Sequence, residues 1–267
     1  MMLEGKVAIV TGGGSGLGAE IAKRFVEEGA RVVVVGRRQR NLEDVIASMP
    51  EGSAIMCAGD VTQAEPRRRV IDAALSFGAG LHVLVNNAGV ADAAAPLAEF
   101  SEEGWNAAIA INLTAPLALM QLAIPHMIEA GGGSIVNVSS LAALAAIPGS
   151  VGYCATKRAL LAVTEVAAVD YGDQGIRCNA ICPGSFLTDM ARHGLEDLSG
   201  GGDPEEARRY FTAPVPQRRL ADPREITGLV AFLASDDSSF VNGATIPIDG
   251  GAHVVDQQAF SISLLKR

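Results

Sequence analysis

The sequence predicts an α/β fold in which a doubly wound parallel sheet of about seven strands carries helices on both faces. Short runs rich in β-branched residues alternate with longer segments that carry apolar residues at helical spacing. Four valines in succession, Val32 to Val35, are typical of a strand that is covered on both faces. A glycine-rich segment directly follows the first apolar run, where a strand would lead into a helix. Such sheets bind ligands beyond the carboxyl ends of their strands.

The elements can be assigned in order along the chain. Seven short apolar segments are expected to be strands, at 6–11, 31–35, 53–57, 81–86, 134–139, 176–181 and 244–248. The first helix is expected to begin near Ser15 and to end at Gly29, which can serve as its C-terminal cap. Further helices are expected at 38–48, 66–77, 102–128, 151–172, 204–211 and 224–235. Strands that alternate with crossover helices give a Rossmann-like arrangement.

Length and composition favour one domain and exclude several classes of protein. The chain has 267 residues, of which 49% are hydrophobic and 19% are charged, so it can bury a full core. We expect a single dinucleotide-binding and catalytic domain over 1–267, with a substrate loop at about 187–214 and a C-terminal tail at about 252–267. The net charge of −9 disfavours nucleic acid as a partner, because such binding needs a basic face.

Neither a membrane span nor a secretory signal is expected. The most apolar long stretch, 113–128, contains two prolines and falls short of the ~20 residues that cross a bilayer. The four cysteines form no C-x-x-C pair, and the chain begins without a basic segment followed by an apolar run. We therefore expect a cytoplasmic protein with reduced, mostly buried thiols. The four histidines are dispersed and show no metal-ligand spacing, so no metal is expected.

The glycine-rich segment is the first candidate site. It reads Thr11-Gly-Gly-Gly-Ser-Gly-Leu-Gly18 and lies between the first expected strand and the first expected helix. Glycine permits positive φ and close approach of a pyrophosphate, while the N-terminus of the helix offers unpaired N–H groups. In this setting a dinucleotide site is favoured over a merely flexible turn.

At these residues the sequence resembles the short-chain dehydrogenase/reductase family, whose T-G-x-x-x-G-x-G pattern is matched by Gly12, Gly16 and Gly18. Further family landmarks follow in order up to Asp249-Gly-Gly251, so the resemblance covers nearly the whole chain. It implies that Asp60 accepts a hydrogen bond from adenine and that Asn87 lies near the ribose. The expected cofactor-binding residues are Gly12, Ser15, Gly16, Leu17, Gly18, Arg37, Arg38, Asp60, Val61, Asn87, Ala88, Gly89, Tyr153, Lys157, Pro183, Gly184, Phe186 and Thr188. The alternatives are structural, since Asp60 could cap a helix, Asn87 could brace a turn and Pro183 could end a strand.

The end of the second strand bears on which nicotinamide cofactor binds. NAD enzymes commonly carry an acidic residue there, whereas the 2′-phosphate of NADP needs positive charge. Gly36, Arg37 and Arg38 occupy this stretch, so NADP(H) is preferred and NAD(H) is the alternative. Ser15 weakens this hypothesis, because many NADP-dependent members of the family carry a basic residue at that position. The two arginines could also be solvated charges at the start of a helix.

The catalytic hypothesis rests on Tyr153 and Lys157, which lie four residues apart in one expected helix and therefore share a face. By the family resemblance they form a tetrad with Ser140 and Asn112. Tyr153 donates the proton, Lys157 stabilises its phenolate, Ser140 hydrogen-bonds the substrate oxygen and Asn112 holds a water for a proton relay. Ser139 is the rival for the serine role, but Ser140 has the family's thirteen-residue separation from Tyr153.

The resemblance thus implies an oxidoreductase that transfers hydride between NADP(H) and a ketone or secondary alcohol, and a homotetramer. An apolar substrate cavity is expected from 141–147 together with Phe186, Leu187 and Met190. The stretches 129–133 and 172–175 lack the basic residues that carrier-protein reductases place at their rim, so a free, uncharged ketone is favoured. The alternatives are an NAD-dependent alcohol dehydrogenase, a 3-oxoacyl reductase of the same family and a noncatalytic nucleotide-sensing protein. An epimerase or dehydratase of the extended relatives would need a larger C-terminal domain.

Overall fold

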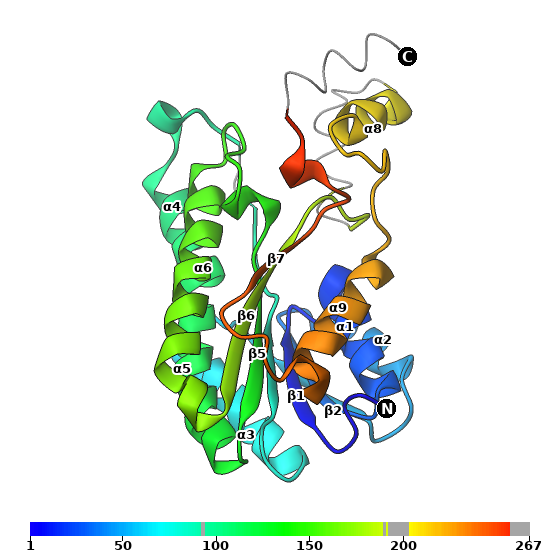
Figure 1. The fold of residues 1–267 in the computed structure, drawn as a ribbon, viewed down its shortest axis with the longest axis vertical. Helices are drawn as coiled ribbons and strands as arrows, with labels where there is room; N and C mark the ends of the chain where they lie inside the picture. The colour runs from blue at the N-terminus through cyan, green and yellow to red at the C-terminus, as the bar shows by residue number, and fades with distance from the viewer. Residues whose placement is uncertain (92–93, 189–190, 192–202, 257–267) are drawn as a thin grey trace.

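The computed structural model contains one parallel sheet of seven strands in the order β3-β2-β1-β4-β5-β6-β7 (Figure 1). The structure describes residues 1–91, 94–188, 191 and 203–256. The strands are β1 (Val7–Thr11), β2 (Arg31–Gly36), β3 (Ala54–Ala58), β4 (Val83–Asn86), β5 (Gly133–Val138), β6 (Ile176–Pro183) and β7 (Thr245–Ile248). The chain reverses its direction of winding between β3 and β4, so a crevice opens at the carboxyl ends of β1 and β4. The predicted fold class is confirmed.

One face of the sheet is covered by α1 (Gly16–Glu27), α2 (Gln39–Ala47) and α9 (Thr227–Ala234), seen together at the right of Figure 1. Ile21 and Phe25 of α1 are fully buried against alternate residues of β1 and β2. Val32 to Val35 are all buried, because their side chains alternate between this layer and the opposite one.

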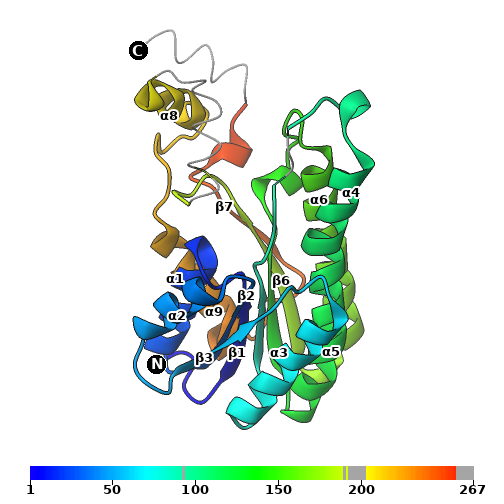
Figure 2. The ribbon, with the colours of Figure 1, turned by 180° about the vertical axis from the view of Figure 1, so that it is seen from behind.

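The other face is covered by α3 (Ala64–Phe77), α5 (Ala115–Glu129) and α6 (Val151–Tyr171), as Figure 2 shows from behind. α4 (Glu102–Ile109) leads into α5 and lies beside α6. The sequence predicts one helix over 102–128, and the structure differs by a π-helical turn at Ala110–Thr114 between α4 and α5. Pro116 has no N–H group, so the carbonyl of Asn112 lacks the donor that a regular helix would supply four residues later.

By length and composition alone, the continuous helical stretch 102–129 could cross a membrane, with a mean hydropathy of 1.8 over its most apolar window. This stretch is longer than the apolar segment 113–128 considered in the sequence, because the π-helical turn joins α4 to α5. Within the fold 44% of that window is buried, and residues such as Leu119 and Met127 pack against the sheet. A core helix of a globular protein meets the same criteria, so they are weak grounds for a membrane span.

Above the carboxyl ends of the strands lie α8 (Pro204–Thr212) and the segment that follows β7 (Figure 1). The chain leaves the sheet at Phe186 and returns at Ala221, where these two residues form a parallel bridge. The predicted substrate loop is therefore closed at its base. Most of its middle, including Met190, lies outside the described residues, as does the tail beyond residue 256.

Candidate active site

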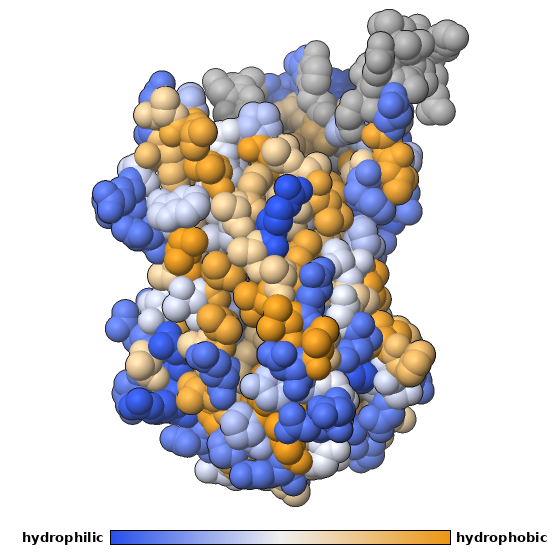
Figure 3. All heavy atoms as spheres, turned by 60° about the vertical axis from the view of Figure 1, so that its left-hand side comes forward, coloured by the Kyte–Doolittle hydropathy of each residue, from blue (hydrophilic) through white to orange (hydrophobic). Residues whose placement is uncertain are grey.

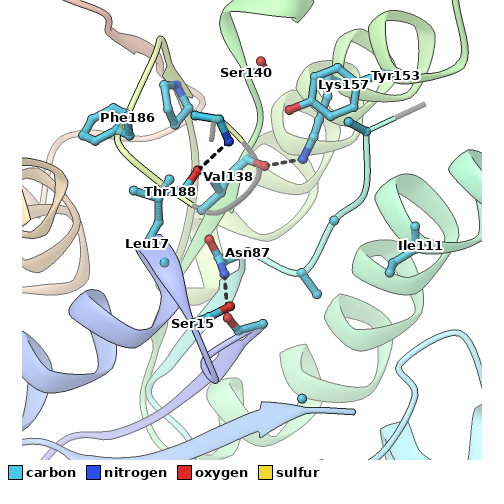
Figure 4. Close-up of a pocket in the computed structure, with 18 of the residues that line it drawn as sticks. Ser15, Leu17, Asn87, Ile111, Val138, Ser140, Tyr153, Lys157, Phe186 and Thr188 are labelled. Carbon is cyan, nitrogen blue, oxygen red and sulfur yellow. Dashed lines mark hydrogen bonds between the residues drawn. The ribbon is translucent and has the colours of Figure 1, made fainter. Parts of the chain in front are cut away.

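A cavity of about 630 Å³ opens at the carboxyl ends of β1, β4, β5 and β6. Figure 4 shows Ser15, Leu17 and Asn87 toward one end of it and Ser140, Tyr153 and Lys157 toward the other. The lining comes from segments far apart in sequence, from Gly12 in the first turn to Phe211 in α8. The topology therefore places the glycine-rich turn and the Tyr/Lys pair in one space.

The glycine-rich turn presents the N-terminus of α1 to this cavity. Gly12 and Gly16 have φ of 65° and 54°, a region that residues with a Cβ rarely adopt. Ser15 is the residue before the helix, yet its side chain makes no capping hydrogen bond, and the first turn carries no acidic residue. The hydroxyl of Ser15 and the first N–H groups of α1 are thus available to an anionic group in the cavity.

Thr11 organises the crossing between the turn and the end of β4. Its hydroxyl donates to the carbonyl of Val85 at 3.2 Å and accepts from the N–H groups of Asn87 and Ala88 at 2.9 and 3.0 Å. The amide of Asn87 donates back to the carbonyl of Thr11 at 2.8 Å. Asn87 therefore braces the turn, as the structural alternative proposed, and also lines the cavity.

The far end of the cavity is bordered by Gly36, Arg37, Arg38, Asp60 and Val61. Arg37 and Arg38 are exposed and lie where β2 ends. Asp60 Oδ1 accepts from the N–H and the hydroxyl of Thr62 at 2.9 and 2.8 Å. The backbone hydrogen bond from Thr62 is the main cause that lowers the pKa of Asp60, and the charge of Arg37 contributes to the same direction. Asp60 is thus ionised, and it shapes its own turn rather than capping α3 directly.

The loop after β6 forms a third side of the cavity. Pro183, Gly184, Phe186 and Thr188 all line it, and Thr188 lies against Gly16 of the glycine-rich turn. A Cβ added at Gly184 would lie 2.7 Å from the Cβ of Asp249, so the family's D-G-G segment supports this loop from behind. The loop after β6 and the glycine-rich turn are therefore in contact at one edge of the cavity.

Lys157 is buried, with 4% of its surface exposed, and its ammonium group donates to the carbonyl of Val138 at 2.8 Å. Burial lowers the pKa of Lys157 to about 8. Its Nζ lies 5.7 Å from the centroid of the Tyr153 ring, and Figure 4 shows the two side chains side by side. A cation next to a phenol favours the phenolate, which eases proton exchange near neutral pH.

Two adjacent serines follow β5, and their hydrogen bonds differ. Ser139 is buried and donates its only hydroxyl proton to the carbonyl of Lys157 at 2.8 Å. The Oγ of Ser140 accepts from the N–H of Ala142 at 3.1 Å, and among the described residues no acceptor takes its proton. Ser140 therefore retains a donor for a ligand oxygen, whereas Ser139 does not.

Asn112 is fully buried in the π-helical turn and does not line the cavity. Its side-chain amide pairs with the backbone of Val90. The amide oxygen accepts from the Val90 N–H at 2.9 Å, and the amide nitrogen donates to the Val90 carbonyl at 3.0 Å. The same nitrogen lies 3.3 Å from the hydroxyl of Thr156. The amide of Asn112 is thus engaged in bracing Val90, and the water relay at this residue stays a prediction.

The cavity gathers nearly all of the predicted site residues, with Gly18 and Asn112 as the exceptions. Gly18 is buried, and a Cβ there would lie 2.4 Å from both the amide nitrogen of Asn87 and the carbonyl of Gly12. The structure assigns it to close packing of α1 under the turn, and its contact with the cofactor stays a prediction. Of the expected apolar positions, Leu141, Ile147 and Phe186 line the cavity. Lining residues that the sequence did not single out include Gly14, Asn41, Ala91, Ile111, Val138, Ser150, Ser185 and Phe211.

The residues present fit a dinucleotide. The glycine-rich turn, the N-terminus of α1 and the Ser15 hydroxyl, which makes no capping hydrogen bond, suit the phosphates of a dinucleotide. Arg37 and Arg38 border the cavity at the end of β2. When bound, a nicotinamide dinucleotide would supply hydride transfer.

Comparison with known proteins identifies the family. Residues 12–253 match the family model described as Enoyl-(Acyl carrier protein) reductase. The chain is 38% identical to the 2,5-dichloro-2,5-cyclohexadiene-1,4-diol dehydrogenase of Sphingobium indicum, over 93% of this chain and 96% of the relative. The chain belongs to the short-chain dehydrogenase/reductase family. The crystal structure of levodione reductase superposes with a TM-score of 0.91 at 32% identity, covering 95% of this chain and 99% of the other. An actinorhodin polyketide ketoreductase variant with NADPH gives a TM-score of 0.89 at 31% identity, with 94% and 98% covered.

As a short-chain dehydrogenase/reductase, the protein is an NAD(P)-dependent oxidoreductase that acts on alcohol or ketone groups. The arrangement can support this chemistry, because a phenol beside a buried ammonium group can give a proton to a carbonyl oxygen or, as the phenolate, take one from an alcohol. Ser140 retains a hydroxyl proton that it can donate to the same oxygen.

Proposed function

We propose that the protein is an NADP(H)-linked carbonyl reductase or secondary-alcohol dehydrogenase for an uncharged, largely apolar substrate. Tyr153 is its proton donor and acceptor, with Ser140, Lys157 and Asn112 in the supporting roles described above. The juxtaposition of Tyr153 and the buried Lys157 beside the glycine-rich turn carries the proposal.

The preference for NADP(H) is supported by the charge at the end of β2. Gly36 stands where NAD enzymes often place a carboxylate, and Arg37 and Arg38 border the cavity there. A guanidinium group can form a bidentate pair with a phosphate. The charge of Arg37 helps to lower the pKa of Asp60, so the two groups interact. The carboxylate of Asp60 would therefore compete with a bound phosphate for the guanidinium group of Arg37. NAD(H) is the alternative.

The apolar substrate is supported by the lining of the cavity that contains Tyr153. Leu141, Ile147 and Phe211 come from three different segments of the chain and offer no charge to a substrate. The two stretches that we expected at the rim of the active site, however, lie elsewhere in the fold. The stretches 129–133 and 172–175 lie at the amino ends of β5 and β6, where Gly131, Gly132 and Gly175 line a separate cavity around Arg177. Their charge therefore does not describe the rim of this chain's own active site.

The test measures kcat/KM for NADPH and NADH with a panel of uncharged ketones and diketones, followed by nicotinamide absorbance. We expect NADPH to be preferred, and Arg37→Ala to weaken NADPH binding about tenfold while leaving NADH binding unchanged. Arg40→Ala is the matched control, because Arg40 is also exposed at the start of α2 but does not line the cavity. A clear NADH preference, or equal effects of the two variants, would refute the cofactor assignment.

The proposal includes a homotetramer in the cytoplasm. Figure 3 shows apolar side chains gathered along the middle of the face that carries α4, α5 and α6. On these helices Trp105, Leu117, Val166 and Val169 are 38%, 39%, 59% and 82% exposed, which supports a contact between subunits. Light scattering that gives the mass of one chain would contradict the tetramer.

Cell fractionation tests the cytoplasmic location, and we expect the protein in the fraction that contains the cytoplasm.

A further inference from the structure

The segment around Ser140 is attached to α6 by the side chains of two consecutive residues, Lys157 and Arg158. Lys157 donates to the carbonyl of Val138, just before the serines. Arg158 donates from Nε to the carbonyl of Ala143 at 2.7 Å and from Nη2 to the carbonyl of Leu144 at 3.2 Å. The attachments therefore lie on both sides of Ser140 in sequence.

The two carbonyls that Arg158 binds lie at the end of the short 3-10 helix Leu141–Ala143, and Ser140 is the N-cap of this helix. Ser140 is built into this turn, because its Oγ accepts from the N–H of Ala142 and its carbonyl accepts from that of Ala143 at 2.9 Å. A shift of the turn would therefore move the Ser140 hydroxyl relative to Tyr153.

Arg158 is exposed and, unlike Lys157, does not line the cavity. It therefore does not touch a ligand in the described part of the site. A planar guanidinium group can reach two carbonyls at once, whereas a lysine ammonium is a single point charge. Water can replace Arg158 at the carbonyl of Leu144, where the hydrogen bond is exposed. Ala143 is buried, so its carbonyl loses its bond to Arg158 without the same ready replacement, and the turn is then less firmly held.

We propose that Arg158 is a positioning residue for the reaction, which fixes the turn after β5 so that the Ser140 hydroxyl stays within reach of the substrate oxygen held near Tyr153. The proposal rests on the role of Ser140 given above. The turn also carries Leu141 to the cavity, so Arg158 sets the position of one apolar contact of the substrate.

The experiment compares Arg158→Met with Arg177→Met, each in the wild-type and the Ser140→Ala background. Arg177 is a matched control, because its guanidinium also donates to two carbonyls, those of Leu233 and Ser235, at the opposite end of the sheet. The measurements are kcat and KM for a ketone that the wild type reduces, and the cofactor Kd by nicotinamide fluorescence.

We expect Arg158→Met to lower kcat/KM about tenfold to a hundredfold, since a misplacement of about 1 Å has an effect of this order. The cofactor Kd stays within about twofold, because the glycine-rich turn is untouched. In the Ser140→Ala background the further loss falls below about threefold, because the residue through which Arg158 acts is gone. Arg177→Met lowers the midpoint of urea unfolding but leaves kcat/KM per folded molecule unchanged in both backgrounds.

An equal loss from Arg158→Met in both backgrounds, or no loss in the wild type, overturns the proposal. Should Arg158→Met fail to fold, Arg158→Lys replaces it, and an intermediate loss that again disappears with Ser140→Ala supports the positioning role. Full activity of Ser140→Ala alone would overturn the assigned role of Ser140, and with it this inference. The two failures are therefore distinguishable.

Discussion

Lys157→Met separates the catalytic role of the buried ammonium group from its effect on folding. Burial lowers the pKa of Lys157 to about 8, whereas an unfolded lysine titrates near ~10.4. The gap between the two values corresponds to roughly 3 kcal/mol. Below pH 8 both the folded and the unfolded chain carry the proton, so the full cost of burying the charge opposes folding. As the pH rises from about 8 to ~10.4 the folded protein loses this proton first, and the free energy of unfolding increases.

We expect the free energy of unfolding of the wild type, relative to Lys157→Met, to increase by about 2 kcal/mol between pH 7 and pH 10. Urea denaturation of both proteins at several pH values measures this difference. The variant also leaves the carbonyl of Val138 without its donor, but that cost does not change with pH. Lys23→Met, which removes a lysine from the surface of α1, is the matched control. A difference that stays constant with pH for Lys157→Met, or that equals the control's, would refute the reasoning.

Two further predictions concern buried contacts around the site. Gly18→Ala places a Cβ 2.4 Å from the Asn87 amide and the Gly12 carbonyl, so we expect a loss of about 1–3 kcal/mol in stability and weaker cofactor binding. Gly228→Ala is its control, since a Cβ there meets nothing within 4 Å; equal thermal stability of both variants would contradict the packing role. Asn112→Ala removes both hydrogen bonds to Val90, and we expect a loss of about 2 kcal/mol together with a lower kcat. Unchanged urea unfolding of Asn112→Ala would show that the amide does not brace that segment.

The strands could be predicted from the sequence because each is a local apolar run, and the valines at 32–35 read directly as a strand buried on both faces. The motif residues could also be predicted, because each motif is a short pattern at fixed spacing along the chain. The π-helical turn was not, because Ala110–Thr114 continues the apolar pattern of its neighbours and only Pro116 hints at an irregularity.

The remaining parts of the site depend on contacts between distant segments. Phe211 and Ile111 reach the cavity through the packing of α8 and of the π-helical turn, which no local spacing encodes. Gly18 belongs to the glycine pattern yet packs beneath it, because a shared motif does not separate glycines that face a ligand from those that admit a neighbouring backbone. Arg158 belongs to no motif, and only its two carbonyl partners reveal it.

The most direct test is the rate of hydride transfer in a single turnover by Tyr153→Phe, measured with saturating cofactor and a ketone that the wild type reduces. Removing the hydroxyl should slow this step by about 10²-fold to 10⁴-fold, the usual contribution of a positioned proton donor. The cofactor Kd should stay close to that of the wild type. A variant that turns over at nearly the normal rate would mean that the proton comes from another group, and the proposed chemistry would be wrong.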